Sequence, residues 1–201
     1  MVLKKKEVPM KKVALFFLKP LSFLPALLMM YLIFQFSAQT GELSGNLSYE
    51  VSYKIVEIGN EILDKGLDEW TIGQYAYEIE YPIRKLAHMT EYFLLAVAVS
   101  FPFYVYGLRG FPLMLVAGLI CVAFACGDEY HQSFVEGRGP SVKDVCIDSI
   151  GAFGGILTVR LICWLFLTPA RVAKRQEAYA YRKMEARRRP ERTPPQILNS
   201  I

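Results

Sequence analysis

Both histidines of the chain lie close to carboxylates at helical spacing. Glu91 follows His88 by three residues, and His131 follows Asp128 by three. Residues three or four apart share a face of an α-helix, so each pair would place an imidazole beside a carboxylate. Such a pair can act as a general base with its orienting group, or supply two ligands to a divalent metal. These four residues are the candidates for catalysis and for metal binding, and the spacing leaves open which role each has.

Other polar residues extend these faces. Asp144 and Asp148 are followed by Gly151 and Gly155 at spacings that keep all four on one helical stripe. Carboxylates followed by small residues predict a close-packed helix interface with the acids at its mouth. The candidate ligand-binding residues of the three segments are Arg84, Gln132, Arg138, Asp144 and Asp148.

Apolar runs surround these polar residues. Of the 201 residues, 53% are hydrophobic and 21% are charged, and the mean hydropathy is +0.26. This composition is too apolar for a disordered chain and unusual for a soluble domain. About 20 apolar residues cross about 30 Å of hydrocarbon, and the runs predict spans over about 21–38, 85–106, 110–130 and 144–167. The predicted fold is all-α, an integral membrane bundle of four transmembrane helices.

The segment 39–83 connects the first two predicted spans. Val51, Ile55, Ile58 and Ile62 repeat at helical spacing, which predicts an external amphipathic helix on the membrane surface or across the end of the bundle. Gly66, Gly73 and Pro82 are expected to interrupt the helical structure on the return to the second span.

Charge divides the chain into blocks. Residues 1–20 contain six lysines and one glutamate, and the tail 168–201 contains nine Lys or Arg against three Glu, whereas the loop 39–83 is acidic. Because basic flanks stay in the cytoplasm, we expect a multi-pass plasma-membrane protein with both termini cytoplasmic and the loops 39–83 and 128–143 outside. The basic residues flank apolar segments at the two ends, so no nucleic-acid partner is predicted. In this orientation all three polar faces open outward, which predicts a shared outward-facing pocket.

The polar motifs resemble the VanZ-like family, which includes a teicoplanin-resistance protein. The resemblance covers roughly residues 21–167. It implies a small multi-pass membrane protein with an influence on teicoplanin susceptibility. The partners expected from the outward-facing position of the pocket are the lipid bilayer and a lipid-linked cell-wall precursor or glycopeptide-related ligand. The matching residues are Ser37 and Gln39; Arg84, Lys85, His88, Glu91 and Tyr92; Asp128, Glu129, His131, Gln132, Phe134, Gly137 and Arg138; and Ser141, Asp144, Asp148 and Gly151.

Three interpretations of the pocket stay open. It could bind an anionic headgroup of a cell-envelope component through Arg84, Lys85, Arg138 and Lys143. It could be the active site of a hydrolase or transferase for a lipid-linked substrate, with or without a divalent metal. It could also be purely structural, holding buried ion pairs such as Arg84–Glu91 and His88–Asp128.

Overall fold

The computed structural model describes residues 19–188. Within this range the chain is helical and contains no strand. Its helices are α2 (Leu24–Ser37), α3 (Gly41–Leu63), α4 (Glu69–Val105), α5 (Gly110–Gln132) and α6 (Val142–Ile162), followed by the short π-helix η1 (Cys163–Leu167) and α7 (Thr168–Arg188). The all-α fold is therefore confirmed.

Between residues 19 and 188, four helices are long and apolar enough to cross a membrane: Lys19–Ser37, Glu69–Val105, Gly110–Gln132 and Val142–Phe166. Their outer faces carry large exposed apolar side chains, for example Leu28, Leu119 and Phe153. A soluble protein rarely exposes so many apolar side chains, whereas lipid tails solvate such a surface. This distribution agrees with the four predicted membrane spans.

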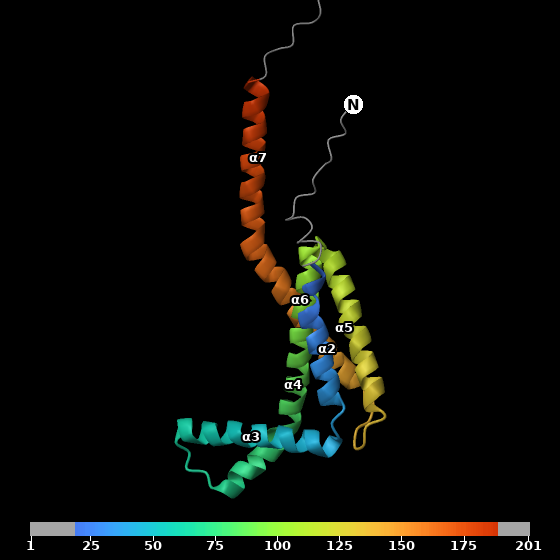
Figure 1. The fold of residues 1–201 in the computed structure, drawn as a ribbon. Helices are drawn as coiled ribbons and strands as arrows, with labels where there is room; N and C mark the ends of the chain where they lie inside the picture. The colour runs from blue at the N-terminus through green and yellow to red at the C-terminus, as the bar shows by residue number, and fades with distance from the viewer. Residues whose placement is uncertain (1–18, 189–201) are drawn as a thin grey trace, which may run out of the picture. The chain divides into compact units, whose positions relative to one another are not determined.

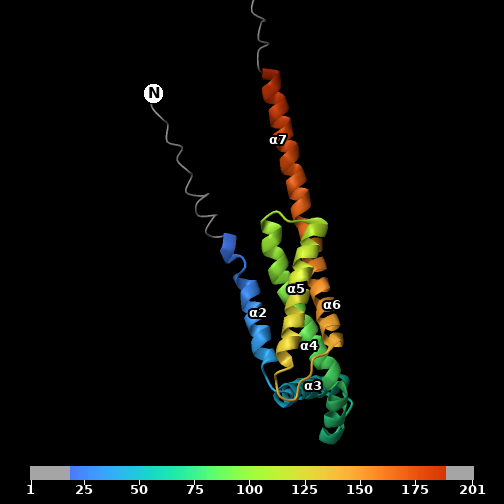
Figure 2. The same ribbon diagram turned by 90° about the vertical axis from the view of Figure 1, so that its right-hand side faces the viewer.

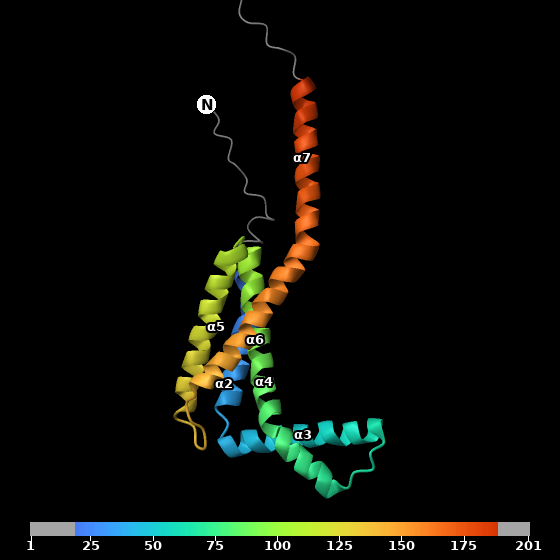
Figure 3. The ribbon, with the colours of Figure 1, turned by 180° about the vertical axis from the view of Figure 1, so that it is seen from behind.

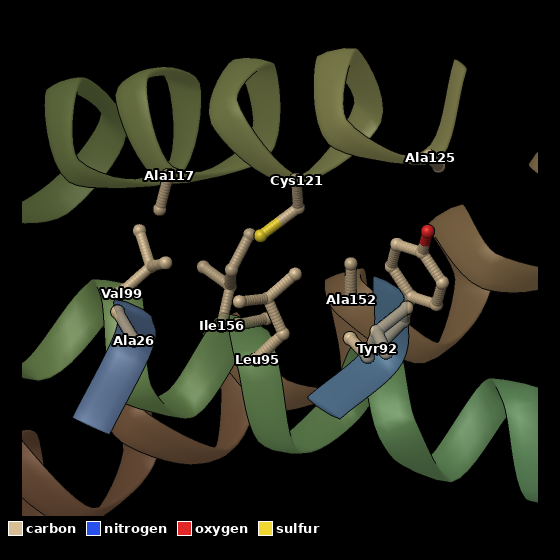
Figure 4. Close-up of a cluster of buried hydrophobic side chains, with 11 residues drawn as sticks. Ala26, Tyr92, Leu95, Val99, Ala117, Cys121, Ala125, Ala152 and Ile156 are labelled. Carbon is tan, nitrogen blue, oxygen red and sulfur yellow. The ribbon is translucent and has the colours of Figure 1, made fainter. Parts of the chain in front are cut away.

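Most side chains of the bundle core are small or medium in size, and the fully buried ring of Tyr92 is the largest of those labelled in Figure 4. Ala96, Ala117, Ala125 and Ala152 are buried together with Leu95. Small residues let helix backbones approach closely, which is how membrane helices gain packing energy without a hydrophobic driving force. The core therefore resembles that of a membrane bundle.

Helix α3 lies across the end of the bundle at which α2 and α5 end and α6 begins, hereafter the α3 end (Figures 1 and 2). Its N-terminus is capped by the Thr40 side chain, which accepts a hydrogen bond from the Leu43 N–H. It ends at Asp64, which adopts the left-handed conformation with φ 47°. The amphipathic helix predicted between the first two spans is present.

Helix α4 differs from the expectation at its start. It begins at Glu69, where the Asp68 side chain caps it, and it runs through Pro82 without ending. Proline removes one backbone hydrogen bond and allows a helix to bend, and α4 changes direction between its part beside α3 and its part in the bundle (Figure 1). Gly66 lies in the loop before α4, as expected, whereas Gly73 and Pro82 lie inside the helix, so the expectation was wrong for these two. The helix continues because the residues on both sides of the proline keep their own hydrogen bonds.

Two glycines set the distance between α6 and α4, which pack against each other (Figure 3). A Cβ atom at Gly151 would lie 2.1 Å from the Met89 carbonyl oxygen, and one at Gly155 would lie 2.3 Å from that of Phe93. No side chain fits at such distances. The predicted small-residue interface is therefore confirmed, with α4 as its partner.

The chain forms a second compact unit from Leu161 onward. Within its described part, η1 leads into α7, whose side chains are exposed over residues 172–185. Several of these are Lys or Arg. The expected cytoplasmic position of this basic segment stays a prediction.

Candidate functional site

Charged side chains from three helices meet at the α3 end of the bundle. The Lys85 ammonium of α4 lies 2.6 Å from the Asp144 carboxylate of α6. Next to this ion pair is a cavity of about 10 Å³, which is close to the volume that one water molecule needs. Its polar lining is formed by Lys85, His88, Glu129, Asp144 and Asp148.

His88 is paired with Glu91 on its own helix. The two side chains approach to 3.4 Å between Nδ1 and Oε2, and both are about one-fifth exposed. This distance is long for a hydrogen bond, and the contact is an ion pair only when the imidazole is protonated. The sequence interpretation paired His88 with Asp128, and that pairing was wrong because His88 faces Glu91 and the cavity near Asp148.

Arg84 is directed toward α3. Its guanidinium forms an ion pair with Glu80 and donates a second hydrogen bond from Nε to the Ser48 hydroxyl at 3.3 Å. The expected Arg84–Glu91 pair is therefore wrong: Glu80 lies one turn before Arg84 and competes successfully for its guanidinium. Arg84 connects α4 to α3 and does not line the cavity.

Asp128 belongs to a separate buried network between α2 and α5. The Ser37 hydroxyl donates to the Asp128 carboxylate at 2.6 Å, and the Gln132 amide donates to Ser37 and Asp128 at 3.0 Å each. All three residues are buried. Ser37 belongs to the motifs that resemble the family but was not among the candidate site residues. Its position at the C-terminal end of the first span could have indicated that it lies near the polar residues of the other spans.

Glu129 holds the loop 133–141 in place. Its carboxylate accepts a hydrogen bond of 2.8 Å from the Ser141 N–H, directly before α6 begins. A carboxylate at a helix N-terminus satisfies a free backbone donor and is stabilised by the helix dipole. Glu129 therefore connects α5 to α6 while it also lines the cavity.

Arg138 lies in the same loop and reaches α2. Its Nη2 donates to the Phe36 carbonyl oxygen at 3.3 Å. Burial lowers the pKa of the guanidinium below its usual value, while nearby Asp128 acts in the opposite direction. Because the arginine pKa starts far above neutrality, Arg138 keeps its positive charge at any physiological pH. Lys143, the other cation of this region, is exposed.

His131 lies apart from the His88 cavity. Its ring stacks on Phe34 of α2, with 4.3 Å between the ring centroids. The two histidines therefore occupy different surroundings, and only His88 lines the cavity.

Several buried polar atoms of these residues have no hydrogen-bond partner among the described residues. A buried polar atom without a partner is costly, so such atoms commonly bind water or a ligand. The atoms are Glu91 Oε2, Tyr92 Oη, Ser100 Oγ, Asp128 Oδ1, His131 Nδ1 and Asp148 Oδ1.

The metal-binding candidates do not form a common ligand set in the part of the chain that the structure describes. No three His, Cys, Asp or Glu side chains there lie in an arrangement that could hold a metal ion. His88 and Glu91 are neighbours, whereas Asp128 and His131 have partners on α2.

A sequence model of the VanZ/LLP1 family matches residues 22–166. The chain belongs to the VanZ/LLP1 family. The match includes all four bundle helices and every candidate residue named from the sequence, and it confirms the resemblance seen in the polar motifs. A search of curated proteins and a search of solved structures each found no match.

Proposed function

We propose that this VanZ/LLP1 family member binds an anionic component of the cell envelope at the α3 end of its bundle. The component that fits best is a lipid-linked cell-wall precursor. Its phosphates lie at the membrane surface, and its hydrocarbon chain can pack against the apolar faces of the bundle. The lipid bilayer then surrounds the protein and also supplies the ligand.

The observation that carries this proposal is the unequal pairing of acids and cations. Asp128, Glu129 and Asp144 each have partners within the protein. Arg138, by contrast, makes a single side-chain hydrogen bond to the described residues. Since arginine has five N–H donors and binds phosphate in a bidentate manner, Arg138 has donors left for a phosphate. Arg138 does not line the cavity that the acids share, so the anion would bind at the loop between α5 and α6 and not among the carboxylates.

The test is mass spectrometry of the lipids that co-purify with the protein in a mild detergent. The wild type should retain polyprenyl-linked phosphates, and Arg138→Ala should retain at least tenfold less, because a charge-assisted hydrogen bond contributes about 1.5–3 kcal/mol. Arg138→Lys should give an intermediate amount.

Arg109→Ala is the matched control. Arg109 lies in the turn between α4 and α5, at the other end of the bundle, where its guanidinium stands 5.4 Å from the Tyr104 ring centroid. This variant should retain as much ligand as the wild type. Recovery of bulk phospholipid alone, in equal amounts from all variants, would contradict the proposal and favour a purely structural role for the polar cluster.

An effect on teicoplanin susceptibility follows from the same proposal. Glycopeptide antibiotics bind cell-wall precursors, so a protein that holds such a precursor changes how much of it the antibiotic reaches. Cells producing the wild type should differ in their minimum inhibitory concentration of teicoplanin from cells producing Arg138→Ala at equal protein levels.

A second candidate function is hydrolysis or group transfer on the bound lipid-linked substrate. It is favoured by the His88–Glu91 pair, which stands beside a cavity of about one water molecule. His88 would act as general base on that water, and Glu91 would orient the imidazole. His88→Ala and Glu91→Gln should then still bind the substrate while its conversion stops, which separates this function from binding alone.

A further inference from the structure

A second cavity lies away from the polar cluster, between α3 and the first turns of α4. Its volume is about 640 Å³, which is within the range of small-molecule sites. Four aromatic and two acidic residues form most of its lining: Tyr49, Tyr53, Trp70, Tyr77, Glu69 and Glu78. We call it the aromatic cleft.

The aromatic rings come from both helices. Tyr49 and Tyr53 lie one turn apart on α3, with 6.3 Å between their ring centroids. Trp70 and Tyr77 of α4 are about 70% and 74% exposed. On α4, Gly73 lies opposite Tyr49, and a Cβ atom there would come within 3.3 Å of the tyrosine hydroxyl. The glycine therefore leaves room for the Tyr49 hydroxyl at the wall of the cleft.

The charge of the cleft is negative. Neither Glu69 nor Glu78 is in an ion pair with any residue between 19 and 188, and no Lys or Arg of that range lines the cleft. The Lys54 ammonium of α3 is already bound to Glu57 at 2.6 Å. An anionic ligand would be repelled here, so the cleft differs in chemistry from the region around Arg138.

Aromatic faces and free carboxylates together are the groups that recognise an organic cation. The ring quadrupole attracts a positive charge over its face, and quaternary ammonium groups are bound by such cages. Contacts of this kind already occur among the described residues: the Lys85 ammonium stands 5.2 Å from the Tyr81 ring centroid, and the Lys19 ammonium 5.5 Å from that of Tyr106. A neutral sugar could also stack on these rings, but it would leave two negative charges without compensation.

We propose that the aromatic cleft binds a ligand that carries an ammonium group. The group would lie over the Trp70 and Tyr77 rings, with Glu69 and Glu78 neutralising its charge. Both a lipid headgroup and a free small molecule can supply this chemistry, and the experiment below distinguishes them. The inference does not depend on the function proposed for Arg138.

Tryptophan fluorescence provides a direct test. The chain has two tryptophans, so Trp164→Phe leaves Trp70 as the only reporter. Purified protein in a detergent without ammonium groups is titrated with tetramethylammonium chloride, and with sodium chloride at equal ionic strength. We expect a saturable change in Trp70 emission with the tetramethylammonium ion alone.

The variant pair compares charges inside and outside the cleft. Glu69→Gln together with Glu78→Gln should weaken tetramethylammonium binding at least tenfold. Glu57→Gln together with Glu61→Gln removes the same charge from α3 outside the cleft and should change binding less than twofold. Circular dichroism checks that both double variants keep their helix content.

Competition identifies the source of the ammonium group. If a short-chain phosphocholine lipid displaces tetramethylammonium and a phosphoglycerol lipid does not, the ligand is a headgroup; if neither lipid competes, it is a free molecule. The proposal is overturned if sodium chloride gives the same response, if the Glu69 and Glu78 variant binds as well as the wild type, or if N-acetylglucosamine binds more tightly than tetramethylammonium.

Discussion

Asp128 and Glu129 are adjacent in sequence but bind to different parts of the bundle. Successive residues of a helix point about 100° apart, so Asp128 faces Ser37 of α2 while Glu129 faces the loop before α6. Only Glu129 lines the small cavity beside His88. The polar motif of α5 therefore contacts both α2 and the loop before α6. His131, whose ring lies beside Phe34, is on the side that faces α2.

A prediction at this scale concerns the pH dependence of the α4 cap. Hydrogen bonds from the Thr71 hydroxyl and the Thr71 N–H hold the pKa of Asp68 below its ordinary value of 3.8. A carboxyl whose pKa is lower in the folded state stabilises that state above its unfolded pKa, and this stabilisation is lost as the pH falls through the folded pKa. Amide exchange in the first turn of α4, corrected for the intrinsic rate, should therefore accelerate below about pH 3.8.

Two comparisons make this result specific to Asp68. Asparagine also caps helices but does not titrate, so Asp68→Asn should lose the pH dependence and keep the protection. The first turn of α3, capped by Thr40, should show no such acceleration. Equal acceleration of amide exchange in both turns would mean that acid destabilises the whole protein, and it would contradict a specific role of Asp68.

The packing of α6 on α4 is the main feature at the scale of elements. Gly151 and Gly155 bring the backbone of α6 onto that of α4, and the Lys85–Asp144 ion pair lies at the start of the same interface. Because Asp148 stands one turn before the first of these glycines, the close approach also buries its carboxylate beside His88. The glycine stripe thus positions the acids of the polar cluster.

Gly151→Ala tests this interface. The added methyl group meets the Met89 carbonyl at 2.1 Å, so the helices must separate, and we expect a loss of about 1–3 kcal/mol in unfolding free energy. Gly154→Ala is the control, since its methyl group would meet only the Phe93 ring at 3.5 Å. Alanine there should be neutral or stabilising by up to about 1 kcal/mol. Thermal melting of both variants in detergent measures the difference, and equal melting temperatures would contradict the packing argument.

The whole molecule is a membrane protein whose polar residues gather at one end of an apolar bundle. The cluster around His88 and the aromatic cleft both lie on the α3 side of the chain, where α3 packs against α4. Because four is an even number of spans, the chain enters the first span and leaves the fourth span on the same side of the membrane. The basic flanks predict that this side is the cytoplasm, so α3 and both cavities would face outward.

Cysteine labelling tests this orientation. In a variant without its four native cysteines, a cysteine replacing Glu57 of α3 should react with a membrane-impermeant maleimide in intact cells. A cysteine replacing Lys183 of α7 should react only after the cells are opened. The reverse pattern would place the α3 end in the cytoplasm and would remove access to extracellular cell-wall precursors.

The sequence by itself was sufficient for the four apolar helices, the amphipathic helix and the family, but not for the start of α4. Apolar runs, the amphipathic repeat of α3 and the small residues of α6 are local patterns, and each predicts a helix or a helix face without knowledge of its neighbours. The motifs around His88, His131 and Asp148 likewise predicted the VanZ-like family, which the family match confirms. The helices follow from composition and spacing, whereas the family rests on the resemblance of the motifs and on the family match.

Only the tertiary structure decided which side chains are partners. Arg84 binds Glu80 and Ser48, His88 meets Glu91, and Asp128 is held by Ser37. The aromatic cleft was not foreseen either, because its rings are brought together only when α4 continues through Pro82 and packs against α3. Spacing fixes the face on which a residue lies, whereas its contacts depend on how each helix is rotated and shifted against the others. That arrangement is a property of the packed bundle, in which a shift of one turn gives every polar group a different partner.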